Sequence, residues 1–404
     1  MARTGGRRPT VETGGRNQRV GRLALGADPQ LSPRHFRFFD NREKYLFFVT
    51  TCSEKTAVAD RVGMEIPNLR PAPPALTLFD AGMGDASVLA RVMSHMHREF
   101  PTVPFRIIAK EISYENLRLG LEKMPDRFAE HPASVLVLTN MYYREVSPLS
   151  PATPEDRARL EWHEIALTGE TAYEFQQQIS ALEPKLARCW EVVRSPKTGN
   201  PHYARPAVLV LYRADHRFLL DRTIPRKDGE APLYDLVLAS QPYRMRQPAA
   251  LKVRSVLAPL CRNLAPGGRL IAVQAHGRDP GEEIVRAIWP DEELFTVSRH
   301  ELSDEIQAQV QETCPDLVYL PYSDRQAVFR YKLLVMPSEL EGEMNISTLV
   351  AAWNAAVYVA QIEDPKVHAA LHDGRYLDAT RDVLRKHNGL WFNDEAFVVA
   401  RRPR

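Results

Sequence analysis

The chain has 404 residues, of which 44% are hydrophobic and 26% charged, which suits one large folded domain with insertions or two domains. Its formal net charge of +2 at pH 7 does not by itself indicate a nucleic-acid partner. It contains neither an apolar run near the ~20 residues of a membrane span nor the apolar core of a secretory signal, so we expect a soluble, cytoplasmic protein with no membrane partner.

The first segment, residues 1–34, is rich in Gly and Arg and poor in large apolar side chains, and it predicts a disordered basic tail. Its arginines could contact an anionic partner, but a purely solubilising role is favoured. Residues 36–62 are rich in aromatic side chains, and their second part predicts a helix that enters the core.

Residues 76–89, LTLFDAGMGDASVL, combine an apolar strand, a glycine turn and the start of a helix. Gly82 and Gly84 allow the backbone to approach a ligand closely, and the helix N-terminus offers unpaired N–H groups. The segment therefore predicts a nucleotide cradle. We assign five cofactor-binding residues to it: Asp80, Gly82, Met83, Gly84 and Asp85.

A second strand is predicted over residues 106–110, and it ends at Glu111, just before a helix with Ser113 as its N-cap. An acidic side chain at this strand end can accept hydrogen bonds from a ribose diol. We therefore predict that Glu111 and the adjacent Ile112 bind the cofactor.

Two classes of cofactor use this arrangement, dinucleotides and S-adenosylmethionine (SAM). A dinucleotide fingerprint has a third glycine where this chain has Ser87. SAM has no pyrophosphate, and it carries a charged amine with which Asp80 could interact. The details therefore favour SAM.

The stretch DAGMGDA resembles motif I of class I SAM-dependent methyltransferases, and KEISYENL resembles their motif II. Residues 263–273, NLAPGGRLIAV, are similar to the helix–PGG–strand element before their fifth strand. The resemblance spans about half of the chain and implies an α/β fold with a Rossmann-like, doubly wound sheet of seven strands, here with large insertions. In this family such leading segments often close over the cofactor, so the resemblance makes Arg42 and Tyr45 candidates for that role, with core packing favoured for Tyr45.

A third strand is predicted within residues 134–146 and ends at Asn140. By resemblance, this strand end touches the adenine, at a position where methyltransferases often place an acid. Asn140 can accept a hydrogen bond through its carbonyl, and Met141 could pack on the adenine face. The resemblance thus adds both residues to the predicted cofactor site.

Residues 147–232 do not fit a minimal methyltransferase and form a first predicted insertion. They include a helical stretch near residues 171–193 and strand candidates at 207–212 and 216–220. Ligands of open α/β sheets bind at the carboxyl edge of the strands. We therefore interpret the insertion as a substrate-binding or dimerising lid, with a purely structural elaboration as the alternative.

The fourth strand, residues 234–244, ends in the tetrapeptide SQPY. This is loosely similar to the (Asn/Asp/Ser)-Pro-Pro-Tyr motif of amino-methyltransferases, with Gln in place of the first Pro. The similarity implies a cofactor contact for Ser240 and catalytic or substrate-binding roles for Gln241 and Tyr243. A polar loop before the next helix is the alternative.

The fifth strand, residues 269–277, places His276 near the active edge. Methyl transfer is an in-line displacement that needs a base only if the nucleophile arrives protonated, and His276 is the candidate base. A structural histidine bonded to a loop carbonyl is the alternative. His163 and His202, in the first insertion, are weaker candidates.

A second insertion is predicted over residues 278–374, with an apolar helix at 345–362 that we expect to be buried against the core or a partner subunit. The last part, residues 375–404, predicts a helix and a hairpin that turns at Asn393–Asp394. With this helix and hairpin at the end of the chain, the two halves of the sheet occupy residues 35–146 and 233–277. An alternative assignment uses residues 316–336 as the final hairpin and treats the rest as a C-terminal appendage.

The four cysteines form no C-x-x-C pair, and we interpret them as free, mostly buried thiols: Cys52, Cys189, Cys261 and Cys314. His368 and His372 could share a helix face, but no general-base carboxylate pattern accompanies them. The sequence therefore predicts no metal site.

Together these features predict a SAM-dependent methyltransferase that acts on an enclosed small-molecule or peptide-like acceptor, with nitrogen among the atoms considered. One alternative is a nucleic-acid amino-methyltransferase that uses the SQPY loop on a flipped base and the basic tail on phosphates. Another is a catalytically silent SAM-binding or interaction protein, and an NAD-linked oxidoreductase is more distant. A homodimer is also considered.

Overall fold

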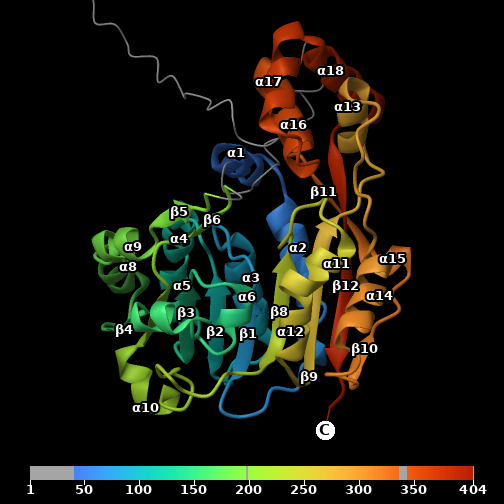
Figure 1. Ribbon diagram of the computed structural model, residues 1–404. Coiled ribbons are helices and arrows are strands. Elements are labelled where there is room, and N and C mark those ends of the chain that lie inside the picture. Colours follow the sequence, from blue (N-terminus) through green and yellow to red (C-terminus); the bar gives the residue numbers. More distant parts are fainter. Residues whose placement is uncertain (1–40, 197–198, 336–343, 404) are drawn as a thin grey trace, which may run out of the picture. The chain divides into compact units, whose positions relative to one another are not determined.

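The structure is a computed structural model that describes residues 41–196, 199–335 and 344–403 (Figure 1). The predicted tail, residues 1–34, lies outside the described residues. Within these ranges we find no helix that combines the length and the apolar character needed to cross a membrane.

Five parallel strands form the centre of the sheet, in the order β9-β8-β1-β2-β3. They are β1 (Leu76–Asp80), β2 (Phe105–Lys110), β3 (Ser134–Thr139), β8 (Tyr234–Ser240) and β9 (Leu264–Ala275). The chain runs outward from β1 to β3 and then returns to the other side of β1 with β8. Such a reversal opens a crevice at the carboxyl ends of the two strands that flank it, here β1 and β8.

Two further strands complete a seven-stranded core. β12 (Trp391–Arg401) pairs antiparallel with β9, and β10 (Leu317–Tyr319) pairs antiparallel with β12, so β10 runs parallel to the central strands. The predicted Rossmann-like, doubly wound sheet is thereby confirmed. The glycines before the predicted fifth strand lie inside β9, where a Cβ on Gly268 would stand 2.5 Å from the carbonyl oxygen of Tyr234.

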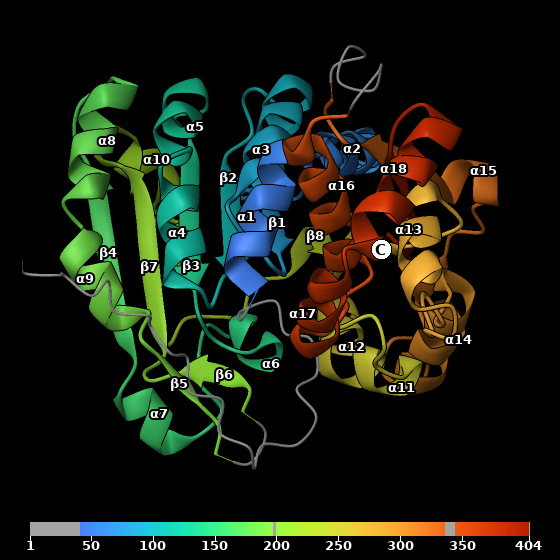
Figure 2. The same cartoon turned by 90° about the horizontal axis from the view of Figure 1, so that it is seen from above.

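Helices cover both faces of the sheet, and Figure 2 shows the two rows on either side of the strands. In β1, Leu76 and Leu78 belong to one apolar core and Phe79 to the other, because alternate side chains point to opposite faces. The first core includes α2 (Glu54–Gly63), η2 (Ile66–Asn68), α3 (Ser87–Glu99), α4 (Tyr114–Leu121), α5 (Met124–Glu130), α8 (Ala172–Ser180) and α9 (Glu183–Cys189). The second includes α6 (Tyr143–Val146), α10 (Arg217–Leu220), α11 (Ala249–Lys252), the π-helical turn η4 (Val253–Leu257), α12 (Ala258–Arg262) and α14 (Arg299–Val310).

The first insertion widens the sheet. The predicted strand at 207–212 is β7 (Ala207–Arg213), which lies antiparallel to β3, and the unpredicted β4 (Glu161–Leu167) lies parallel to β7 at the edge. The strand predicted at 216–220 is wrong, because this segment is helical and Phe218 is exposed. The remaining elements are α7 (Pro154–Ala158), η3 (Ala214–His216) and a separate two-stranded sheet of β5 (Val192–Arg194) and β6 (Pro201–Tyr203).

The predicted terminal hairpin is also wrong, because β12 is one continuous strand. Asp394 pairs with Ala275 of β9 on one side and with Phe329 of β11 (Val328–Lys332) on the other. The side chain of Asn393 donates to the carbonyls of Gly277 and Arg278 instead of forming a turn. Because β10 and α14 belong to the core sheet and its cover, residues 278–374 are only partly an insertion.

A group of helices that we call the helical cap has an apolar core of its own. It consists of α1 (Arg42–Thr51), α13 (Pro280–Ile288), α16 (Ile346–Val359), α17 (Asp364–Asp373) and α18 (Arg375–His387). The short α15 (Asp324–Ala327) leads into β11. The expectation that the apolar helix α16 is buried is confirmed, since Leu349, Ala352 and Ala355 have no exposed surface. In Figure 1 the cap stands at the end of the sheet toward which β9 points.

Candidate functional site

A cavity of about 250 Å³ lies at the carboxyl ends of β1 and β8, where the strand order reverses. The loop after β1, the end of β2, the loop after β8 and the helices α1 and α2 contribute to its wall, together with β11 and the end of α16. Eight of the ten predicted cofactor residues line it: Asp80, Gly82, Met83, Gly84, Asp85, Glu111, Ile112 and Ser240.

The glycine loop after β1 is shaped by its backbone. The N–H of Gly82 donates to Oδ1 of Asp80 at 3.1 Å, and the N–H of Gly84 donates to Oε2 of Glu111 at 2.9 Å. A Cβ on Gly82 would meet no atom within 4 Å, so this position faces open space. Gly84 has φ +55°, and a Cβ there would stand 2.5 Å from the hydroxyl of Tyr45.

Glu111 ties the end of β2 to this loop. Its Oε1 accepts from the N–H groups of Ile112 at 2.8 Å and Ser113 at 2.7 Å, while Oε2 accepts from Gly84. Burial raises the pKa of the carboxyl above its usual value, and the backbone donors oppose that rise. The predicted N-cap is confirmed, because the side chain of Ser113 accepts from the N–H of Asn116.

Asp80, the last residue of β1, is a buried acid beside the glycine turn. Burial raises its pKa to about 7, and the carboxylate of Glu111 adds to the rise. The N–H of Gly82 and the ammonium of Lys55 act in the opposite direction. A carboxyl with this pKa is poised to ionise when a cation binds beside it.

The N-terminal helices bring further polar groups to the cavity. The hydroxyl of Tyr45 donates to Oδ1 of Asp85 at 3.1 Å and accepts from its N–H at 3.2 Å. Lys55 forms an ion pair with Glu54 at 2.9 Å and lies over the ring of Tyr45 at 5.1 Å. Arg42 lines the cavity and pairs with Glu115. The sequence pattern pointed to Arg42 and Tyr45 but not to Glu54 and Lys55, because an acid–base pair at a helix start has no distinguishing pattern.

The predicted adenine contacts at the end of β3 require a correction. Asn140 accepts from the N–H of Ala207 at 2.9 Å and donates to the carbonyls of Cys189 at 3.2 Å and Arg205 at 3.0 Å. Met141 is fully buried in the core on the α6 side. Neither residue lines the cavity, because the insertion packs on this strand end and its backbone groups form the hydrogen bonds of the Asn140 side-chain amide.

The loop after β8 is split between the cavity and the core. Gln241 lines the cavity and has φ +48°. Tyr243 does not line it, since its hydroxyl donates to Oε1 of Gln274 at 3.3 Å. His276 also lies outside the lining, with Nδ1 3.3 Å from Oε2 of Glu395. The structure therefore brings only one of the three predicted catalytic side chains to the cavity.

Tyr143 is a lining residue that the sequence did not reveal. Its hydroxyl donates to the carbonyl oxygen of Ala81 at 2.9 Å, and burial raises its pKa. Tyr331 of β11 and Tyr358 of α16 complete an aromatic wall. These residues come from segments that are far apart in the chain, so no local motif could have joined them.

Comparison with known proteins gives distant structural likenesses. No protein-family profile and no curated protein matches the chain. A solved geranyl diphosphate methyltransferase in complex with GPP and sinefungin is 13% identical, with 85% of this chain and 78% of that one covered and a TM-score of 0.31. PKMT2 from Rickettsia typhi in complex with AdoHcy is 8% identical, with 84% and 52% covered and a TM-score of 0.25.

Phosphoethanolamine N-methyltransferase 2 of Haemonchus contortus in complex with SAM is 9% identical, with 86% and 99% covered and a TM-score of 0.21. All three TM-scores lie below 0.5. At such TM-scores the likenesses assign no function, so the fold assignment rests on the strand order and the site on the geometry above.

Proposed function

We propose that this protein is a SAM-dependent methyltransferase whose cofactor occupies the cavity at the ends of β1 and β8. The observation that carries the proposal is a glycine cradle closed by Glu111, with open space at Gly82 and an excess of acidic groups around it. Glycine where the backbone must approach a ligand, and an acid at the end of the second strand, are what a nucleoside cofactor of this fold needs.

The charge of the cavity favours SAM over a dinucleotide. Among the described residues, its lining has four carboxylates against three cationic side chains. The carboxylates are Glu54, Asp80, Asp85 and Glu111, and the cations are Arg42, Lys55 and Lys110. SAM carries a sulfonium, an ammonium and a carboxylate, and so complements this excess. A pyrophosphate would instead meet a lining in which acidic side chains outnumber basic ones.

When bound, SAM supplies an electrophilic methyl group for an in-line displacement. The protein then has to hold the acceptor in line with that methyl and to exclude water, which can lower the barrier by ~7–11 kcal/mol through orientation alone. Gln241 and the hydroxyl of Tyr143 are the polar groups we assign to acceptor positioning. Tyr243 and His276 do not line the cavity, and we assign them no contact with the acceptor.

We further infer that the acceptor is an enclosed small molecule or a peptide-like group. The helical cap supports this, because residues of α1 and of the end of α16 line the same cavity as the glycine loop. An amine is one acceptor class, since Gln241 offers an amide carbonyl. The nucleic-acid alternative depends on the SQPY likeness, and that likeness is weakened by the position of Tyr243.

Isothermal titration with SAM, S-adenosylhomocysteine and NAD tests the proposal. SAM and S-adenosylhomocysteine should bind with one site each, and NAD should not. NAD binding without SAM binding would overturn it. Incubation with methyl-labelled SAM and pools of small amines, peptides and RNA then separates the acceptor classes. Removal of residues 1–34 should leave methylation of a small acceptor unchanged, whereas an RNA acceptor would lose label.

A further inference from the structure

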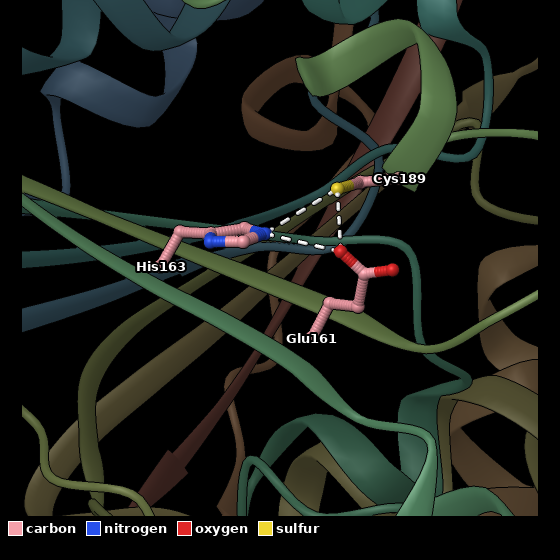
Figure 3. A group of neighbouring side chains, drawn as sticks. All are labelled: Glu161, His163 and Cys189. Atoms are coloured by element: carbon pink, nitrogen blue, oxygen red, sulfur yellow. Dashed lines mark hydrogen bonds and ion pairs between the residues drawn. The ribbon is translucent and has the colours of Figure 1, made fainter.

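Three side chains of the first insertion converge on one point outside the cofactor cavity (Figure 3). Glu161 and His163 stand two residues apart on the edge strand β4, so both project from the same face. Cys189 is the last residue of α9. The Sγ of Cys189 lies 3.2 Å from Oε2 of Glu161 and 3.4 Å from Nε2 of His163, and the last two atoms are 3.3 Å apart.

We propose that Glu161, His163 and Cys189 bind Zn²⁺. In a tetrahedral zinc site, bonds of ~2.0–2.3 Å place neighbouring ligand atoms ~3.3–3.8 Å apart. The three observed separations, 3.2, 3.3 and 3.4 Å, lie within about 0.1 Å of the short end of that range. A thiolate, an imidazole and a carboxylate suit zinc, whereas calcium and magnesium prefer oxygen ligands alone. The fourth position is left for water.

The charges around Glu161 fit a bond through one carboxylate oxygen. Arg205 lies 3.2 Å from Oε1, the oxygen that the cluster does not use, and can hold the carboxylate in place while Oε2 binds the metal. Arg188 lies 3.5 Å from Oε2, but its side chain is 61% exposed and can turn into solvent. On binding, the thiol of Cys189 releases its proton to water, since the thiolate is the ligand.

A zinc ion here would fix the end of α9 to the sheet edge, and this end reaches the cofactor site. The carbonyl of Cys189 accepts from the side chain of Asn140 at the end of β3. The next residue, Trp190, donates from Nε1 to the carbonyl oxygen of Glu111 at 2.8 Å. The insertion would thus act as a metal-fixed buttress for the strand ends that carry the cradle, which is a role different from that of a lid.

The test is metal binding by the full-length protein without an affinity tag. The protein is stripped with a chelator, dialysed and titrated with ZnCl₂ by calorimetry, and its absorption is recorded with Co²⁺ in place of zinc. We expect one zinc equivalent per chain and a cobalt–thiolate charge-transfer band. A cluster held only by hydrogen bonds would take up no zinc and give no band, and this result would overturn the proposal.

Three variants locate the ion. Cys189→Ser should abolish the cobalt band, and His163→Gln should lower zinc affinity at least about tenfold, since even partners of ligands contribute 10–100-fold. Cys314→Ser is the matched control, because Cys314 is also a buried free cysteine but packs in the core on the α14 side of the sheet. Equal zinc binding by Cys189→Ser and the unmodified protein would contradict the assignment. If Cys189→Ser does not fold, the zinc affinity of His163→Gln tests the proposal instead, because His163 is only half-buried.

Discussion

Glu111, at the end of β2, accepts a hydrogen bond from the backbone N–H of Gly84, 27 residues earlier in the chain. Its other oxygen holds the N–H groups of Ile112 and Ser113. A carboxylate has about four acceptor sites, so one remains for a ligand hydroxyl after these three donors are satisfied. The same side chain therefore shapes the cradle and offers a contact to what it holds.

Glu111→Ala should weaken SAM binding by about 5–150-fold, which corresponds to ~1–3 kcal/mol for lost charge-assisted hydrogen bonds. Glu111→Gln should also weaken it, because the amide nitrogen cannot accept from Gly84. Calorimetric titration measures both. Glu122→Gln, which removes an exposed partner of Arg118, is the control and should bind SAM as the unmodified protein does. SAM affinity within error of the unmodified value in Glu111→Ala would place the ribose elsewhere.

The two glycines of the cradle should respond differently to substitution. Gly82→Val adds a side chain to open space, so thermal stability should be kept while SAM affinity falls by at least about tenfold. Gly84→Ala should lower both, since its Cβ meets the Tyr45 hydroxyl and its φ is positive. Thermal melting and SAM titration of each variant give the comparison.

A double variant isolates the contact at Gly84. In Gly84→Ala combined with Tyr45→Phe the hydroxyl is gone, and the nearest ring carbon is 3.4 Å from the new Cβ. The melting temperature should then recover part of the loss seen in Gly84→Ala. No recovery would mean that backbone strain alone, and not the tyrosine, makes this position a glycine.

The central strands could be predicted from sequence because each is an apolar run buried on both faces. Residues of β1, β3 and β8 are almost all buried, and glycine or polar residues mark their ends. The loop at Gly82 and Gly84 could also be predicted from the sequence, since a glycine turn between a strand and a helix is a local pattern. Both features depend only on neighbours in the chain.

The features that sequence did not reveal depend on distant partners. β4 lies at the edge and keeps polar residues such as Glu161 and Glu164, so it lacks an apolar run. The side chain of Asn140 is hydrogen-bonded to backbone groups 49 to 67 residues later in the chain, and no local sequence pattern predicts these contacts. Asn393 and Asp394 resemble a turn, but pairing on both sides keeps them within a strand.

SAM affinity should depend on pH through Asp80. Burial raises its pKa from 3.8 to about 7, and a bound ammonium favours the ionised form, so affinity should rise with pH and level off above about 7. Titrations at constant ionic strength over about pH 5.5–7.5 measure the slope. Asp80→Asn should bind more weakly and lose most of the slope. An unchanged slope in that variant would assign the dependence to another group.

Ionisation of Asp80 should raise SAM affinity but lower the stability of the protein without SAM. Between pH 3.8 and about 7 the native state holds a proton on Asp80 that the unfolded chain has released. The contribution of this residue to the free energy of unfolding therefore falls as pH rises through that window. Urea titrations of the unmodified protein and of Asp80→Asn, compared at the two ends of the window, isolate this contribution.

The indole of Trp190 should strengthen SAM binding although it does not line the cavity. It is buried, and its Nε1 donates to the carbonyl oxygen of Glu111. Trp190→Phe keeps an apolar ring and removes the donor, so SAM affinity should fall about 2–10-fold, as expected for one hydrogen bond of ~0.5–1.5 kcal/mol. Trp353→Phe is a matched control, because Trp353 is a buried residue of the helical cap whose Nε1 has no hydrogen-bond partner among the described residues. Both variants lose ring volume and some thermal stability, but only Trp190→Phe should alter SAM binding in calorimetric titration. Equal losses of affinity in the two variants would show that ring packing, and not the contact with Glu111, is responsible.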